Sequence, residues 1–353
     1  MTKLEVMKKI LLLRFSSIGD IVLTTPVIRC LKKQVSDVEL HFATKDSFGF
    51  LLEENPYVDK VHLLKDEKSN MKQLLSNLKS ENFDLIVDLH NNLRTFRIKN
   101  SLGVKSYSFD KLTWEKILLV KFKIDKMPNV HIVQRYLDTV KKLGVVNDEN
   151  GLDYFYPDKD EIEMDWLPKS FQKGFSVFAL GGQHATKRLP ISKMIELCTK
   201  INGPIILLGG GNDDEKAARE IEQFFHPLDS KTTPKEEEVL LNDLNKKAHI
   251  FNGVGKFSLN QSASVVKLSS RVFTHDTAVM HIASAFKKEV FSIWGNTTPS
   301  LGMYPYETKF TIFEVKGLSC RPCSKIGFDQ CPKGHFKCMN DQKFDFYLPD
   351  AGW

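Results

Sequence analysis

The sequence has no apolar run long enough to cross a membrane. Its longest apolar stretches, such as residues 10–13 and 205–208, fall far short of the about 20 residues that a bilayer-spanning helix requires. They have the length of buried strands. The first residues also lack the pattern of a secretory signal, because acidic Glu5 accompanies a short apolar run and no small-residue cleavage site follows. We therefore expect a cytoplasmic protein.

Two common nucleotide-binding signatures are missing as well. The first strand-like run is not followed by G-x-G-x-x-G, and no G-x-x-x-x-G-K-[ST] occurs, which argues against dinucleotide binding there and against a P-loop. Cysteine is scarce, with six among 353 residues, so a disulfide-dense secreted scaffold is excluded. The composition, 42% hydrophobic and 27% charged, is that of a globular protein whose length suits two domains.

Apolar runs of strand length alternate with segments of helical period along most of the chain. This alternation predicts parallel sheets covered by helices on both faces. We predict an α/β protein with two doubly wound, Rossmann-like halves at residues 1–150 and 175–353. A linker rich in Asp, Pro and Gly joins them at residues 151–174. Strands are expected at residues 8–14, 38–43, 61–64, 83–89, 104–109, 176–180, 204–208, 249–251, 271–274 and 290–294, and helices at 191–201, 213–225, 259–268 and 278–286.

The net charge of +6 lies entirely in the first half of the chain. Residues 1–150 hold 25 Lys and Arg against 19 Asp and Glu, whereas residues 151–353 hold 25 of each kind. Residues 90–131 alone hold nine basic and three acidic side chains, among them Arg94 and Arg97. Such a surface attracts anions, from nucleic acid to lipid headgroups or a charged substrate, although a solvated face without a partner is equally consistent.

The loops after the strands are expected to carry the chemistry, because open α/β sheets bind ligands at the carboxyl ends of their strands. The first loop, residues 15–20, ends in Asp20 at a helix start. Ser17 and Gly19 beside it allow a ligand to approach the backbone. Asp20 could serve as a catalytic carboxylate, or it could only cap the helix, as Asp often does in this position.

Two glycine loops in the second half are candidates for nucleotide binding. Gly181 and Gly182 precede adjacent Lys187 and Arg188, which could bind a diphosphate as a point charge and a forked donor, or could be solvated surface cations. Three glycines at residues 209–211 precede acids that could accept hydrogen bonds from ribose hydroxyls or favour a helix start. These acids are Asp213, Asp214 and Glu215.

The segment at residues 274–285 combines a strand end with a helix start, which is a natural anion site because unpaired N–H groups point outward there. Asp276, Thr277 and Ala278 occupy the turn. His281 lies one turn into the helix and could meet the same anion, although a His in an apolar helix is more often a core residue.

Five stretches in this order resemble glycosyltransferase family 9, the heptosyltransferases of the lipopolysaccharide inner core. They are KILLLRFSSIGDIVLTTPVIRCLKK, FDLIVDLHNNLRTFRI, HIVQRYLDTVKKLG, GGQHATKRLP and FTHDTAVMHIASAFKKEVFSIWGNTTP, and the likeness extends over about residues 8–339. The first and last stretches are specific. The resemblance implies the GT-B fold, with two Rossmann-like domains facing a central cleft, and inverting, metal-independent transfer of heptose from ADP-heptose.

The resemblance also implies roles for particular residues. Asp20 matches the general base, and Lys187, with Arg188 beside it, matches the group that neutralises the leaving diphosphate. Asp276, Thr277 and Ala278 match the loop that holds donor sugar and phosphate, with His281 in the same motif. One of Asp213, Asp214 and Glu215 would face the ribose. Ser17, Gly19, Arg94 and Arg97 lie in the half that binds the acceptor, and no cofactor is required.

The sequence departs from the family in two places. The family usually has Gly after Asp-Thr, where this chain has Ala278, so the fit to the donor sugar depends on the backbone conformation there. The amphipathic helix that usually closes the chain is also missing from residues 341–353. These departures leave open transfer of a different sugar, or a noncatalytic nucleotide-sugar-binding protein.

Four of the six cysteines gather near the end of the chain, at Cys320, Cys323, Cys331 and Cys338. Their spacing could accept a structural Zn²⁺, form disulfide or redox-sensitive pairs, or leave reduced thiols that pack a loop.

The partner expected for the first half is a lipid A-linked acceptor. Residues 111–125 mix lysines with apolar side chains and could rest on the inner leaflet as a peripheral contact, or form an ordinary amphipathic helix. No nucleic-acid-binding module is recognised. We expect a monomer.

Overall fold

The computed structural model describes residues 8–66, 70–226 and 248–348, and it divides the chain into two compact units. The first unit comprises Met1–Thr113 and Pro128–Pro157, and the second comprises Trp114–Met127 and Asp158–Trp353. The segment expected to be a linker is therefore shared between them. Residues 158–174 belong to the second unit, where Ile162 N donates to Ser264 Oγ at 2.8 Å and Phe171 is fully buried.

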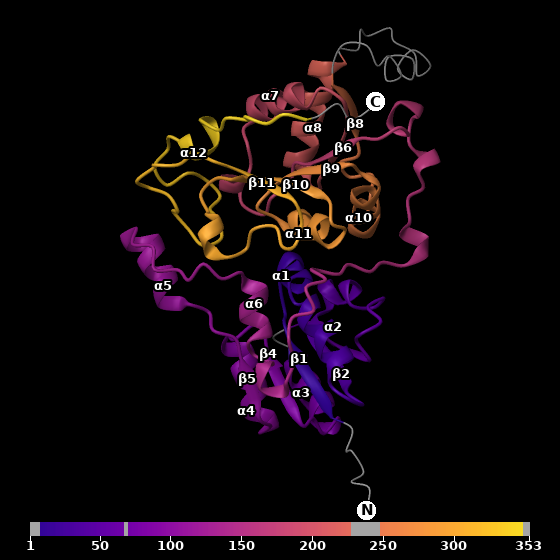
Figure 1. The fold of residues 1–353 in the computed structure, drawn as a ribbon, viewed down its shortest axis with the longest axis vertical. Helices are drawn as coiled ribbons and strands as arrows, with labels where there is room; N and C mark the ends of the chain where they lie inside the picture. Colours follow the sequence, from indigo (N-terminus) through magenta and orange to yellow (C-terminus); the bar gives the residue numbers. More distant parts are fainter. Residues whose placement is uncertain (1–7, 67–69, 227–247, 349–353) are drawn as a thin grey trace, which may run out of the picture. The chain divides into compact units, whose positions relative to one another are not determined.

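The first unit is built on a five-stranded parallel sheet in the order β3-β2-β1-β4-β5 (Figure 1). Buried apolar runs form its strands, and the core includes Leu11, Phe15 and Ile86. The strands are β1 (Lys9–Leu13), β2 (Glu39–Lys45), β3 (Lys60–Leu64), β4 (Leu85–Asp88) and β5 (Ser106–Ser108). The helices are α1 (Ile18–Val22), α2 (Thr25–Gln34), α3 (Met71–Ser80), α4 (Leu93–Leu102) and α6 (Ile132–Leu137).

The second unit is built on a six-stranded parallel sheet in the order β11-β10-β9-β6-β7-β8. Its strands are β6 (Ser176–Ala179), β7 (Pro204–Leu208), β8 (His249–Asn252), β9 (Arg271–His275), β10 (Glu289–Trp294) and β11 (Phe310–Glu314). Its helices include α7 (Ile191–Ile201), α8 (Asn212–Phe225), α10 (Leu259–Leu268), α11 (Ala278–Ala285) and α12 (Lys337–Asn340). Helix α5 (Thr113–Ile117) begins at the boundary between the units and continues into a π-helical turn, Leu118–Phe122.

These elements confirm the predicted α/β class and the existence of the predicted strands and helices, with corrections at three strands. Strands β4 and β5 are each three residues shorter than predicted. Edge strand β11 was not predicted, although its sequence, FTIFE, is rich in residues that favour strands. No helix in the described parts of the chain is long and apolar enough to span a bilayer.

The last described segment packs on the second unit without a closing helix. Phe344 is 1% exposed, and its ring lies 5.4 Å from that of Phe313, edge to face. Gln342 donates through Nε2 to Trp294 O at 3.0 Å. Phe346 contacts the stacked pair Phe273 and Phe291. Aromatic packing in an extended segment therefore covers the apolar surface that a helix would otherwise cover.

Candidate active site

The candidate site of the first unit is the loop that leaves the carboxyl end of β1. Asp20 lies in the first turn of α1, where Oδ2 accepts from Ser17 N at 3.0 Å and from Ser17 Oγ at 2.8 Å. Its other oxygen, Oδ1, pairs with Arg14 Nη2 at 2.6 Å. The side chain is still 20% exposed. Asp20 therefore caps the helix start, as one of the two sequence interpretations holds, and also presents a partly accessible carboxylate at the ligand-binding edge of the sheet.

Arg14 holds this loop in place, and the sequence analysis did not single it out. Its guanidinium donates to Ser16 O at 2.7 Å, to Leu89 O at 2.6 Å and to the Tyr136 hydroxyl at 2.9 Å, in addition to its pair with Asp20. Only 8% of the residue is exposed. The position of Arg14, directly after the apolar run of β1, could have indicated this role from the sequence. A buried guanidinium needs several fixed hydrogen-bond partners.

Arg14 sets the protonation behaviour of Asp20. Burial alone would raise the pKa of Asp20, but the Arg14 guanidinium and the Ser17 hydrogen bonds outweigh burial and hold that pKa below its usual value. At neutral pH the carboxylate is therefore ionised, which is the form that accepts a proton.

This coupling predicts a shifted pH profile when Arg14 loses its charge. In Arg14→Gln, burial persists without the opposing cation, so the pKa of Asp20 rises and the acidic limb of kcat/KM against pH moves to higher pH by about 1–3 units. Arg14→Lys keeps the charge and is expected to keep the limb near that of the wild type. If the acidic limbs of the kcat/KM profiles of the wild type and Arg14→Gln coincide, the protonation of Asp20 does not control the rate.

The predicted acceptor residues lie around the same loop. Ser17 is exposed and Gly19 is buried. The Arg94 guanidinium lies 5.0 Å from the centre of the Phe15 ring, a cation–π contact next to the loop. Arg97, one turn along α4, is exposed. Ser17, Gly19 and Arg94 therefore lie in or against the Asp20 loop, and the acceptor role of all four residues stays a prediction.

The candidate site of the second unit combines two of its loops. Lys187 Nζ pairs with Asp276 Oδ2 at 2.7 Å and donates to Asp276 O at 3.0 Å. Thr297 Oγ1 donates to the same carboxylate at 2.9 Å. Both charged side chains remain partly accessible, at 16% and 12% exposure. Lys187 and Asp276, which are both candidates from the sequence and lie 89 positions apart, are therefore in direct contact.

Helix α11 begins beside this ion pair. Thr277 is its N-cap residue, with extended backbone at φ −142°, and Ala278 is the first helical residue. Among the described residues, those with positive φ do not include Ala278, so the alanine in the position of the family's glycine causes no backbone strain. His281 lies one turn further on and is 3% exposed. Its contact with a donor phosphate stays a prediction.

The acids after the third glycine loop differ in exposure. Asp214 is 5% exposed, accepts from Gly210 N at 2.9 Å, and lies so close to Gly181 and Gly209 that any Cβ there would come within 3 Å of its carboxylate. Arg188 pairs with Asp213 at 2.9 Å, and the Asp213 side chain is 77% exposed. Asp214 therefore braces the glycine loops, whereas Asp213 and Glu215 are the more open candidates for the ribose.

The four clustered cysteines are free thiols. Cys320 Sγ lies 3.8 Å from His335 Nε2, and Cys323 Sγ donates to Cys320 O at 2.9 Å. Burial raises the pKa of the Cys338 thiol to about 12. Within the described ranges, the one group of three or more potential metal ligands with mutually close ligand atoms is His41, His62 and Glu81. The four cysteines are present as reduced thiols, one of the three alternatives, and a structural Zn²⁺ bound by them stays untested.

Comparisons with known proteins identify similar sequences and similar folds. Residues 230–332 match the family model for glycosyltransferase family 9 (heptosyltransferase). The chain is 24% identical over 309 residues to lipopolysaccharide heptosyltransferase 1 of Campylobacter coli, with 83% of this chain and 85% of the relative covered. The structure resembles the ADP-heptose lipopolysaccharide heptosyltransferase II of E. coli, with a TM-score of 0.64, 17% identity, and 94% and 98% of the two chains covered. It also resembles E. coli heptosyltransferase WaaC solved with ADP, with a TM-score of 0.61, 19% identity, and 86% and 93% covered. The fold is the GT-B type with two Rossmann-like domains.

Proposed function

We propose that the chain is a member of glycosyltransferase family 9 and that it transfers heptose from ADP-heptose to an inner-core lipopolysaccharide acceptor, with inversion and without a catalytic metal. The observation that supports this proposal best is the Lys187–Asp276 pair at the start of α11, in the unit whose glycine loops suit a nucleotide. ADP-bound and ADP-heptose-related structures among the similar proteins point to the same donor.

The proposed reaction is a displacement at the anomeric carbon. Asp20 removes the proton of an acceptor hydroxyl, the freed oxygen attacks the anomeric carbon, and the bond from that carbon to the ADP oxygen breaks with inversion. The transition state has oxocarbenium character while negative charge grows on the departing diphosphate. Lys187 and the N–H groups at the start of α11 stabilise that charge. Asp276 holds the Lys187 ammonium in position.

The proposed acceptor is linked to lipid, and one element of the second unit suits a membrane surface. Trp114 in α5 is 76% exposed and Phe122 in the following turn is 63% exposed, while Leu119 between them is 5% exposed and anchors the element. Lysines at 116, 121, 123 and 126 lie close to these residues in the sequence. Exposed aromatic rings among lysines match the boundary between lipid tails and anionic headgroups. We therefore infer peripheral contact with the inner leaflet of the membrane.

The proposed donor is tested by measuring ADP release from ADP-heptose in the presence of a lipid A acceptor carrying keto-sugar acids. We expect turnover that depends on the acceptor. The product is expected to have the anomeric configuration opposite to that of the donor. UDP- and GDP-sugars serve as matched controls and are expected to be inactive. Turnover with another nucleotide sugar alone would favour the different-sugar alternative, and donor binding without any turnover would favour a noncatalytic binder.

A further inference from the structure

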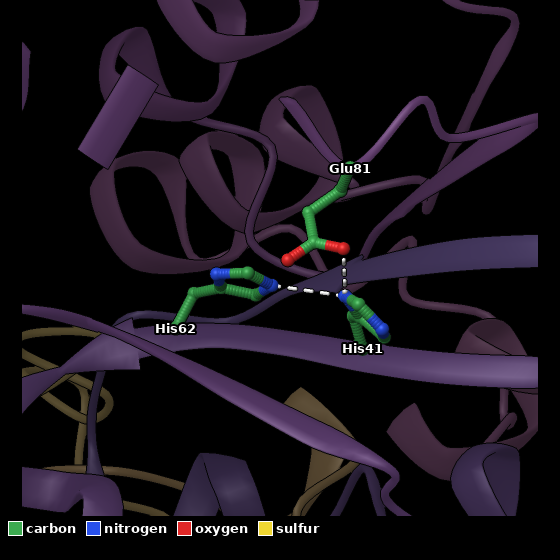
Figure 2. A group of neighbouring side chains, drawn as sticks. All are labelled: His41, His62 and Glu81. Carbon is green, nitrogen blue, oxygen red and sulfur yellow. Dashed lines mark hydrogen bonds and ion pairs between the residues drawn. The ribbon is translucent and has the colours of Figure 1, made fainter. Parts of the chain in front are cut away.

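A buried cluster in the first unit lies away from the candidate active site. It comprises His41 on β2, His62 on β3 and Glu81, which directly follows α3 (Figure 2). Lys9, Glu39 and Lys60, which border the cluster, are the first residues of β1, β2 and β3. Because the strands are parallel, the cluster lies toward the amino ends of the strands, opposite the edge from which the Asp20 loop departs.

The three ligand atoms converge on one point. His41 Nδ1 lies 2.9 Å from His62 Nε2 and 3.9 Å from Glu81 Oε2, and all three atoms lie within 4.8 Å of one another. A metal ion bonded at about 2.0–2.2 Å to each of two imidazole nitrogens and a carboxylate oxygen requires separations of this size. His41 is 0% exposed and His62 is 6% exposed, and both rings pack edge to face on Phe83.

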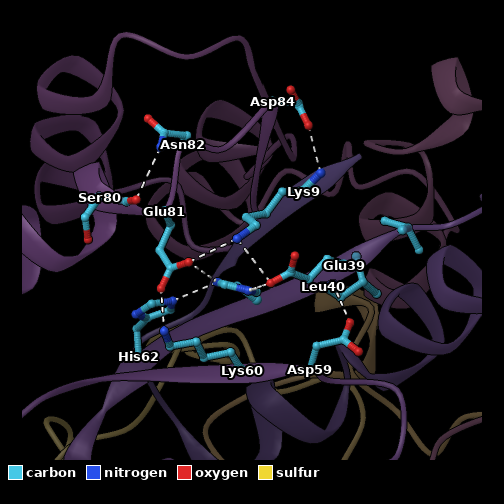
Figure 3. Close-up of polar contacts among 12 residues, drawn as sticks. Lys9, Glu39, Leu40, Asp59, Lys60, His62, Ser80, Glu81, Asn82 and Asp84 are labelled. Atoms are coloured by element: carbon cyan, nitrogen blue, oxygen red, sulfur yellow. Dashed lines mark hydrogen bonds and ion pairs between the residues drawn. The ribbon is translucent and has the colours of Figure 1, made fainter. Parts of the chain in front are cut away.

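Glu39 orients the His41 ring toward the cluster. This carboxylate also pairs with Lys9 (Figure 3), and its Oε1 lies 2.6 Å from His41 Nε2. With the proton on Nε2, His41 Nδ1 turns its lone pair toward the cluster and accepts a hydrogen bond from His62 Nε2, whose proton a bound metal ion would replace. A carboxylate behind a histidine is the usual outer partner of a metal-bound imidazole.

We propose that His41, His62 and Glu81 form a binding site for a divalent transition metal of the zinc class, with water completing the coordination. Two nitrogens and one carboxylate oxygen are a donor set that Zn²⁺ and Co²⁺ accept readily. Since the site joins β2, β3 and the end of α3 at the edge remote from Asp20, a bound ion stabilises the first unit and takes no part in glycosyl transfer.

Two ammonium groups compete with a metal at this site. Lys9 pairs with Glu81 Oε2 at 3.1 Å and with Glu39 at 3.2 Å, and Lys60 pairs with Glu81 Oε1. The Lys60 side chain is 54% exposed, so it can leave Glu81 for solvent when a cation arrives. This competition makes Lys60 the discriminating position: its removal weakens a network of ion pairs but strengthens a metal site.

The test is a titration of the full chain with Co²⁺ after treatment with a chelator, followed by visible absorption. Co²⁺ bound by the clustered cysteines is distinguished from Co²⁺ at the histidine site by its absorption, because thiolate ligands give a charge-transfer band that nitrogen and oxygen ligands do not give. We expect one ion bound through nitrogen and oxygen in the wild type, loss of this ion in His62→Gln, and an affinity lower by about 10–100-fold in Glu39→Gln. Lys60→Gln is expected to bind more tightly than the wild type. His335→Gln, which changes an exposed histidine beside Cys320, is the matched control and is expected to leave this ion unchanged.

Thermal unfolding with Zn²⁺ completes the test. Zn²⁺ is expected to raise the Tm of the wild type and of Lys60→Gln but not that of His62→Gln. The proposal is overturned if the wild type binds no Co²⁺ through nitrogen and oxygen, if His62→Gln binds it equally well, or if Lys60→Gln binds it more weakly. These readouts do not depend on glycosyl transfer, so they stand apart from the proposed enzymatic function.

Discussion

Asp20→Asn is expected to lower kcat by about 10²–10⁴-fold, which is the usual contribution of a general base. Asparagine has nearly the same shape but cannot accept the acceptor proton. Donor affinity is expected to survive, because the predicted phosphate-binding residues, Lys187 and Asp276, belong to the other unit. Steady-state kinetics combined with calorimetric titration of ADP would separate the loss of chemistry from a loss of donor binding.

The control for this substitution must account for the buried partner of Asp20. In Asp20→Asn, Arg14 loses its ionic partner, so Tm and circular dichroism must accompany the kinetics. Asp37→Asn makes the same chemical change at an exposed position where φ is 51°, a conformation that asparagine tolerates, and it is expected to be neutral. A folded Asp20→Asn protein with wild-type kcat would exclude Asp20 as the base.

Lys187→Met is expected to lower kcat/KM by about 10²–10³-fold, in line with removal of one preorganised charge that stabilises the transition state. The loss has two parts. The departing diphosphate loses a cation, and the Asp276 carboxylate is left without its ionic partner where that diphosphate would bind. Kinetics with ADP-heptose and calorimetric titration of ADP would measure both parts.

A double substitution separates these two parts. Adding Asp276→Asn to Lys187→Met removes the repulsion, so the double variant is expected to bind ADP more tightly than Lys187→Met alone. Lys193→Met is the matched control, since Lys193 lies on α7 and pairs with Glu196 at 2.7 Å. If Lys187→Met and Lys193→Met had equal kinetics, Lys187 would have no role in stabilising the leaving group.

The elements of the fold were largely predictable because local signals define them. The boundaries of α7 and α10 agree with the prediction, where Pro190 precedes the first helix and Ser258 caps the second by accepting from Gln261 N at 3.2 Å. Strand β11 was missed although its sequence, FTIFE, favours a strand. A local pattern predicted the elements best where the apolar residues were accompanied by clear signals at the ends.

The candidate site was predictable only in part, because its contacts are long-range. Asp20, Lys187 and Asp276 follow strands, and such positions can be identified from the sequence. The role of Arg14 could not be predicted in the same way, since its partners Leu89 and Tyr136 lie 75 and 122 positions away. The cluster of His41, His62 and Glu81 could not be predicted from the sequence for the same reason. His41 and His62 come together through the pairing of β2 with β3.

The direct pairing of Lys187 with Asp276 has a consequence for selectivity. In the resting protein the lysine's charge is already offset by its partner, so a small inorganic anion meets little net attraction there. The proposed donor would gain from binding at this pair only through further contacts of its base, ribose and sugar, which would offset the rearrangement of the pair. Under the proposed function, mutual neutralisation would therefore favour a complete nucleotide donor over the abundant free phosphate of a cell.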